Sequence, residues 1–271
     1  MKRRKPCHFT YTWILIFICL LICGVKCEYK DIVFLLDSSG SISPGNFEEV
    51  VDFVSNVTSW LTIGPNETLV SVVTYASNVT EHFSLATYTS SSDAISAIQS
   101  LKSITPEGGT YTHLALNYSY EHSFGVRNGS SKAVVVLTDG RSVSRTETEK
   151  AADDLRSMEV EVYAVGVRSD LSLTDLDLQV IANDPDSYYI TYVDDFVYLC
   201  NVVPGIVSKL DASAVANSVQ GCPEMPTTTS SSKVTEEATT TTDSTTTTTI
   251  DASTTGMAIL SSNRRISHRV Q

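Results

Sequence analysis

Two continuous apolar runs that each end in an aspartate constrain the fold of this chain more than any other feature. The first run, in the segment DIVFLLD, stops at Asp37, and the second, in KAVVVLTDG, stops at Asp139. Uninterrupted apolar runs of this length are typical of parallel strands that are buried on both faces of a sheet. The two runs therefore predict a central pair of buried strands whose ends carry carboxylates.

Strand and helix patterns alternate along the rest of the chain. We predict strands at 31–36, 69–76, 79–85, 132–140, 160–167 and 187–193, and helices at about 47–61, 91–101, 112–124, 146–157, 174–182 and 195–210. This alternation predicts an α/β fold with a doubly wound, mostly parallel six-stranded sheet covered by helices on both faces. The second and third strands are joined too closely for a crossover helix, so one of them is expected to be an antiparallel edge strand.

The ends of the chain differ from this central part, which we place at 28–222 as one domain. Four basic residues at 2–5 and a short apolar stretch at 13–25 predict a secretory signal peptide over 1–27, with a signal anchor as the alternative. Cleavage could follow Gly24 or Cys27. Residues 223–271 are expected to form a Thr/Ser-rich, mucin-like or simply disordered tail. We expect the mature protein to be secreted into the extracellular matrix, without association with a membrane.

The charge balance excludes one class of partner. The chain has a net charge of −12, and five of its 19 basic residues but none of its 31 acidic residues lie in 1–27. Removal of that segment would leave 14 basic residues and a net charge of −17. Phosphate binding needs clustered Lys and Arg, so we expect no nucleic-acid partner. Divalent metals and cationic partners remain compatible with this charge.

Cysteines and glycosylation sequons also fit a secreted protein. Of the six cysteines, Cys7, Cys19 and Cys23 lie inside the predicted signal peptide and Cys27 is its last residue, so the disulfide candidates are Cys27, Cys200 and Cys222. Cys200 would pair with Cys222 if cleavage follows Cys27, whereas a retained Cys27 could pair with Cys222 instead. Five N-x-S/T sequons predict N-glycosylation. Their asparagines are Asn56, Asn66, Asn78, Asn117 and Asn128.

Hydroxyl side chains accompany both strand-terminal aspartates. In doubly wound sheets ligands bind beyond the carboxyl ends of the strands, so Asp37 and Asp139 should lie close together there. Ser39 and Ser41 follow the first aspartate, and Thr110 follows two glycines in another loop. Each fragment alone would suit a helix cap or a turn. Together, two carboxylates and three hydroxyls form an all-oxygen donor set that suits a hard cation such as Mg²⁺.

These residues resemble the motifs of the von Willebrand factor type A domain, a family that includes integrin inserted domains and matrilins. Asp37-Ser38-Ser39-Gly40-Ser41 is similar to the family's D-x-S-x-S pattern, Thr110 to its distant threonine and Thr138-Asp139-Gly140 to its aspartate strand. The resemblance covers about 28–212 and implies a metal-ion-dependent adhesion site. It also implies a last helix that can shift to change affinity, although here that helix contains Pro204-Gly205.

The resemblance implies a specific mode of binding. Ser39, Ser41 and Thr110 would contact a Mg²⁺ ion, or Mn²⁺ or Ca²⁺, directly or through water. Asp37 and Asp139 would bind the ion or support the residues that do. An acidic side chain of an extracellular protein ligand, collagen-like or another matrix protein, would complete the coordination.

Two functions other than adhesion are compatible with an α/β domain of this kind. An aspartyl phosphatase needs a second acid at position 39, which is serine, and no G-x-S-x-G elbow is present, so we expect no enzymatic activity. His113 could border the site but is more easily explained as a polar helix position. The alternative function is a structural acidic glycoprotein of an extracellular or mineralised matrix that acts through surface charge and its Thr-rich stalk. Acidic residues gather in the last third of the domain, at Asp170, Asp175, Asp177, Asp184, Asp186, Asp194 and Asp195.

Overall fold

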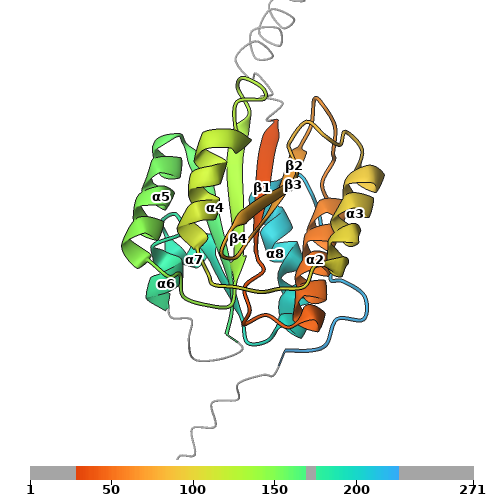
Figure 1. Ribbon diagram of the computed structural model, residues 1–271. Coiled ribbons are helices and arrows are strands. Elements are labelled where there is room, and N and C mark those ends of the chain that lie inside the picture. Colours follow the sequence, from red (N-terminus) through yellow and green to blue (C-terminus); the bar gives the residue numbers. More distant parts are fainter. Residues whose placement is uncertain (1–28, 169–174, 226–271) are drawn as a thin grey trace, which may run out of the picture. The chain divides into compact units, whose positions relative to one another are not determined.

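The computed structural model describes residues 29–168 and 175–225 (Figure 1). The predicted signal peptide, Cys27 and nearly all of the predicted Thr/Ser-rich tail lie outside these ranges. Within them, no helix is both long and apolar enough to cross a lipid bilayer.

A six-stranded sheet forms the centre of the domain, in the order β3-β2-β1-β4-β5-β6. The strands are β1 (Lys30–Asp37), β2 (Leu69–Tyr75), β3 (Val79–Phe83), β4 (Ser131–Thr138), β5 (Val160–Val167) and β6 (Ile190–Val193). β1 pairs in parallel with both β2 and β4, and β5 pairs in parallel with β4 and β6, whereas β3 runs antiparallel to β2 at the edge. The predicted doubly wound sheet with one antiparallel edge strand is therefore confirmed.

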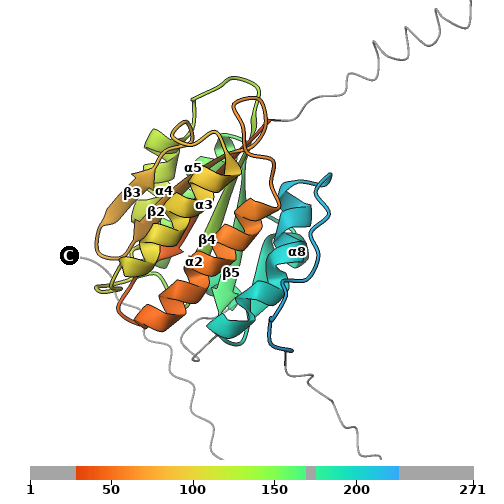
Figure 2. The same ribbon diagram turned by 90° about the vertical axis from the view of Figure 1, so that its right-hand side faces the viewer.

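Helices cover both faces of the sheet. The longer ones are α2 (Pro44–Ser59), α3 (Ser91–Ser100), α4 (Thr112–Tyr118), α5 (Arg145–Ser157) and α8 (Leu199–Leu210). The short ones are η1 (Leu101–Ser103), η2 (Ser119–Ser123), α6 (Asp175–Gln179), α7 (Asp186–Tyr189) and η3 (Phe196–Tyr198). Figure 2 shows α2, α3 and α8 on one face of the sheet, and α4 and α5 lie on the other.

The position of β1 at the centre of the sheet explains why its sequence is uniformly apolar. Ile32, Phe34 and Leu36 pack into the core beneath α2, α3 and α8. Val33 and Leu35 point to the opposite face and pack into the core beneath α4 and α5. All five side chains are fully buried, because successive residues of a strand point to opposite faces and both faces are covered.

One predicted strand begins later than expected. Residues 187–189 belong to the helical turn α7, and β6 starts only at Ile190. The backbone N–H groups of Tyr188 and Tyr189 donate to the Pro185 carbonyl, at 2.9 and 3.2 Å. Both tyrosine rings pack against Tyr163 of β5, with centroids 6.3 and 4.9 Å away. An aromatic-rich segment is typical of a strand, but here the rings pack together from a helical turn.

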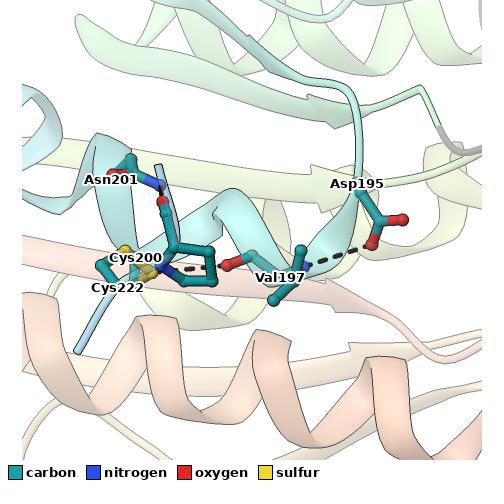
Figure 3. The surroundings of a disulfide bond; sticks show 6 residues. Asp195, Val197, Cys200, Asn201 and Cys222 are labelled. Atoms are coloured by element: carbon teal, nitrogen blue, oxygen red, sulfur yellow. Dashed lines mark hydrogen bonds between the residues drawn. A yellow bond between two sulfur atoms is a disulfide. The ribbon is translucent and has the colours of Figure 1, made fainter. Parts of the chain in front are cut away.

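A disulfide between Cys200 and Cys222 links the start of α8 to the segment that follows this helix (Figure 3). The Cα atoms of the two cysteines lie 5.9 Å apart. The structure thus contains the pairing expected if cleavage follows Cys27, rather than a Cys27–Cys222 bond. Between the two cysteines the chain leaves α8 and returns to its start, and Asn201 Nδ2 donates to the Pro223 carbonyl at 2.8 Å. Side chains of the returning segment pack against the core, namely Ala214, Ala216 and Val219. Pro204 lies inside α8 without ending it.

Candidate metal centre

The two strand-terminal aspartates lie at the same edge of the sheet. β1 and β4 are adjacent parallel strands with Leu36 opposite Leu137, so the residues that follow these two leucines emerge side by side. Asp37 is 1 % exposed and Asp139 is 3 % exposed, which is unusual for carboxylates. This edge is the one at which α/β sheets bind ligands.

Hydrogen bonds join the serines of the first loop to the second aspartate. Ser41 Oγ donates to Asp139 Oδ1 at 2.8 Å, across 98 residues of sequence. Ser39 Oγ lies 3.2 Å from Ser41 Oγ, and the Ser39 backbone N–H donates to Asp37 Oδ1 at 2.9 Å. Asp37, Ser39, Ser41 and Asp139, four of the five predicted site residues, are therefore joined in one continuous hydrogen-bond network.

Burial of the Asp37 carboxyl has an electrostatic cost. Burial is the main reason why the pKa of Asp37 is raised from 3.8 to about 6, and the nearby charge of Asp139 also raises this pKa. Hydrogen bonds from Ser39 and Thr138 oppose this rise, because they stabilise the ionised form. Two carboxylates held this close in a buried position would be stabilised by a bound cation.

Thr138 is a site residue to which sequence reasoning assigned no role of its own. Its Oγ1 donates to Asp37 Oδ2 at 2.7 Å and fixes that carboxylate from the neighbouring strand. The hydroxyl at the end of an otherwise apolar strand was the signal in the sequence. Its role could not be deduced because the pairing partner lies 101 residues away.

Thr110 lies at the rim of this network, beside the loop that follows Asp139. Its Oγ1 is 3.7 Å from the position of a Cβ atom built on Gly140, next to Asp139. Backbone hydrogen bonds tie its loop to the others: Gly40 N–H donates to the Gly108 carbonyl at 3.0 Å, and Val143 N–H to the Thr110 carbonyl at 2.9 Å. Gly108 has φ +86° and a Cβ there would lie 2.6 Å from Ser77 Oγ, so this close approach requires glycine.

The donor set fits a hard cation. Two carboxylates and three hydroxyls supply oxygen alone, which Mg²⁺, Mn²⁺ and Ca²⁺ prefer. Among the described residues, no three His, Cys, Asp or Glu side chains gather in a way that could hold a metal. A metal ion at this edge would therefore depend on the serine and threonine hydroxyls as well as on the two aspartates.

His113 does not join this network. It is buried on α4, and its Nε2 lies 3.2 Å from Glu147 Oε2 on α5, so it links two helices.

The asparagines of the five sequons differ in exposure. They are exposed at positions 66, 78 and 128 and half-buried at positions 56 and 117.

Comparison with known proteins identifies relatives of this domain. The model of the von Willebrand factor type A domain matches residues 31–204, which is more than half of the chain. Human matrilin-1 is 35 % identical over 173 residues, covering 61 % of this chain and 34 % of matrilin-1. The collagen alpha-1(XXI) chain of Xenopus laevis is 32 % identical over 187 residues, covering 69 % of this chain and 19 % of the collagen chain.

A solved structure of similar fold extends the comparison. Proximal thread matrix protein 1 from the mussel byssus, described with a zinc-occupied MIDAS motif, superposes with a TM-score of 0.61. It is 28 % identical, and the match covers 73 % of this chain and 50 % of the mussel chain. The present chain spans about a third or less of the two curated relatives, so only the shared domain is compared. On its sequence and its fold, the chain belongs to the von Willebrand factor type A domain family.

Proposed function

We propose that this domain binds an extracellular protein ligand through a divalent cation at the edge of β1 and β4. Asp37, Ser39, Ser41, Thr110 and Asp139 hold the cation, and an acidic side chain of the ligand completes its coordination. The observation that carries this proposal is the Ser41–Asp139 hydrogen bond of 2.8 Å, which joins the loop after β1 to the end of β4 in one oxygen-lined site. The bound ion supplies the positive charge that attracts a carboxylate.

Mg²⁺ is the expected ion, with Mn²⁺ or Ca²⁺ as substitutes. The mussel protein carries zinc in its MIDAS motif. Zinc favours nitrogen and sulfur donors, and the five residues here supply neither. We therefore expect Mg²⁺, Mn²⁺ and Ca²⁺ to be the more natural occupants in solution.

The proposed setting is the extracellular matrix. A disulfide is typical of an oxidising compartment, and the five sequons are expected to be glycosylated in a secreted protein. Matrilins and a collagen chain are among the relatives, which supports a matrix protein as the partner, collagen-like or otherwise. Binding without catalysis is the proposed role, and the acidic chain makes nucleic acid an unsuitable partner.

The charge-based alternative has less support. Several acidic residues of the last third have local structural partners rather than forming a free acidic surface. Asp177 pairs with Arg145 at 2.8 Å, Asp186 accepts a hydrogen bond from Gln179, and Asp195 accepts one from the backbone at the start of η3. These contacts favour ordinary roles as caps and ion pairs.

Calorimetric titration of the secreted chain with Mg²⁺, and then with Mn²⁺ and Ca²⁺, tests the proposal. We expect saturable binding at one site, lost in Asp139→Ala. Glu149→Ala is the matched control, because it removes one exposed carboxylate from α5 and should leave the titration unchanged. Absence of binding by the unmodified chain would contradict the proposal.

The ligand half of the proposal needs a separate measurement. Binding of the chain to immobilised matrix proteins, collagen among them, should require Mg²⁺ and be abolished by EDTA and by Asp139→Ala. Binding that survives both but falls steeply with salt would instead support the charge-based role.

A further inference from the structure

A groove lies directly beside the proposed metal centre. Its volume is about 800 Å³, and it contains two of the proposed metal-binding hydroxyls, those of Ser41 and Thr110. The rest of its wall comes from the loop that follows Asp139, from the start of α5 and from α6. The charged and apolar side chains in this wall are Arg141, Val143, Arg145 and Asp177. A ligand whose carboxylate reaches the metal would therefore also contact this wall.

The two arginines of the groove differ in their surroundings. Arg145 forms an ion pair of 2.8 Å with Asp177, whose side chain is only 8 % exposed. The positive charge of Arg145 is therefore already balanced. Arg141 is exposed and has no hydrogen bond or ion pair to any residue in the part of the chain that the structure describes. It is a free positive charge in the wall of the groove, in a chain whose net charge is −12.

The backbone holds Arg141 close to the metal centre. Arg141 lies two residues after Asp139, which accepts a hydrogen bond from Ser41 Oγ at 2.8 Å. On its other side, Val143 N–H donates to the Thr110 carbonyl at 2.9 Å, so the loop is held on both sides of Arg141. The Val143 side chain is 58 % exposed and gives the same wall a small apolar surface. A ligand that spans the metal and the groove can thus contact the cation, a free guanidinium and an apolar side chain.

We propose that Arg141 determines ligand specificity, by pairing with a second acidic side chain of a protein segment whose first acidic side chain lies at the metal. This inference rests on the proposed function. It names the ligand class more narrowly: an extended segment with two carboxylates close in sequence. Arginine suits this role because its planar guanidinium binds carboxylates through two parallel hydrogen bonds.

Synthetic peptides with blocked ends test this specificity. One peptide carries a single Glu in a Gly/Ala background, a second carries another Glu two positions later, and a third carries Lys at that later position. Their affinities for the full chain are measured by fluorescence anisotropy, in Mg²⁺ and in EDTA. An exposed ion pair is worth little, so the two-Glu peptide should bind roughly threefold to fivefold tighter than the single-Glu peptide at low salt.

Substitutions assign the preference to one side chain. Arg141→Ala should remove the preference for the two-Glu peptide, and Arg141→Glu should shift it to the Lys peptide. Lys150→Ala is the matched control, because it removes one positive charge from an exposed position on α5 and should keep the preference. Rising salt should reduce the preference as the charges become screened.

The outcomes separate this inference from the proposed function. Equal binding of the one-Glu and two-Glu peptides, or a preference that persists in Arg141→Ala, would overturn the role of Arg141. The proposed function would still stand if the single-Glu peptide bound in Mg²⁺ and not in EDTA. Failure of every peptide to bind in Mg²⁺ would overturn both.

Discussion

Ser41 Oγ donates a 2.8 Å hydrogen bond to Asp139 Oδ1, and this contact joins the loop after β1 to the end of β4. Ser41 is exposed while Asp139 is almost fully buried, so the pair connects the surface with the floor of the site. An ion bound here would be open to solvent on the side of Ser41, where a ligand can reach it.

Removal of this hydroxyl should weaken metal binding without harming the fold. For Ser41→Ala we expect Mg²⁺ affinity to fall on the order of tenfold to a hundredfold, because the residue both donates to Asp139 and is a proposed ligand. The free energy of unfolding should fall by only about 1–2 kcal/mol, because the buried Asp139 carboxylate loses one hydrogen-bond donor. Calorimetry and urea denaturation measure the two quantities. Ser96→Ala, at an exposed position on α3, is the control, and equal affinities in the two variants would contradict the role of Ser41.

Metal binding should depend on pH through Asp37. The pKa of this carboxyl is about 6 in the metal-free domain, so a bound proton competes with the cation below that pH. Mg²⁺ affinity should be constant above about pH 7 and fall by about tenfold per pH unit below pH 6. Calorimetric titrations between pH 5 and pH 8 test this, and an affinity that is flat over the whole range would contradict it.

The same shift predicts a change in stability. The folded-state pKa of Asp37 is raised from 3.8 to about 6, so ionisation is easier in the unfolded chain. The contribution of Asp37 to the free energy of unfolding should therefore decrease by about 3 kcal/mol as pH rises from about 4 to above 6, and then stay constant. The difference in unfolding free energy between Asp37→Asn and the unmodified metal-free protein isolates this contribution. As pH rises, the free energy of unfolding of Asp37→Asn should increase relative to that of the unmodified protein. A difference that does not change with pH would contradict this prediction.

A buried ion pair stabilises the opposite end of β1. Asp31 is fully buried and accepts hydrogen bonds from Arg127 Nε at 2.8 Å and from Ser130 Oγ at 2.6 Å. Arg127→Ala would leave the Asp31 carboxylate without its positive partner, so we expect a loss of about 3–5 kcal/mol in the free energy of unfolding. Lys150→Ala breaks an exposed pair with Asp154 and should cost less than about 1 kcal/mol. Urea denaturation distinguishes the two, and similar losses would show that burial of Asp31 has little energetic effect.

The disulfide should stabilise the end of the domain. It closes a segment of 22 residues, and a loop of this length predicts a contribution of about 3 kcal/mol. Thermal unfolding of the double variant Cys200→Ser/Cys222→Ser measures the loss, and peptide mapping of the unmodified protein checks the pairing itself. Recovery of a Cys27–Cys222 peptide would contradict the pairing in the structure.

Pro204-Gly205 was a departure from the family pattern, and the structure shows α8 continuing through it. Gly205 is exposed, and a Cβ built on it meets no atom within 4 Å. Gly205→Ala should therefore raise the free energy of unfolding by about 0.5–1 kcal/mol, because alanine loses less backbone entropy in a helix. Chemical denaturation measures this gain, and a destabilised variant would show that this part of α8 is not a stable helix in solution.

The sequence by itself determined the sheet, because its signals are local. Apolar runs such as Ile32–Leu36 and the short link between β2 and β3 predict buried parallel strands and an antiparallel edge without knowledge of any distant contact. The approach of Asp37 to Asp139 also follows from local signals, since both end central strands of a parallel sheet.

Only the tertiary structure decided which side chains support these elements. The hydrogen bond from Thr138 to Asp37, the ion pair between Arg127 and Asp31, and the free guanidinium of Arg141 beside the site all depend on loops that pack together from distant parts of the chain. The pairing of Cys200 with Cys222 was one of two alternatives until α8 and the returning segment were placed. Residues 187–189 became a helical turn because their rings pack on Tyr163, a contact with a different strand. Periodicity reports how a segment is buried, whereas these contacts depend on which distant segments meet, and that is settled only by packing.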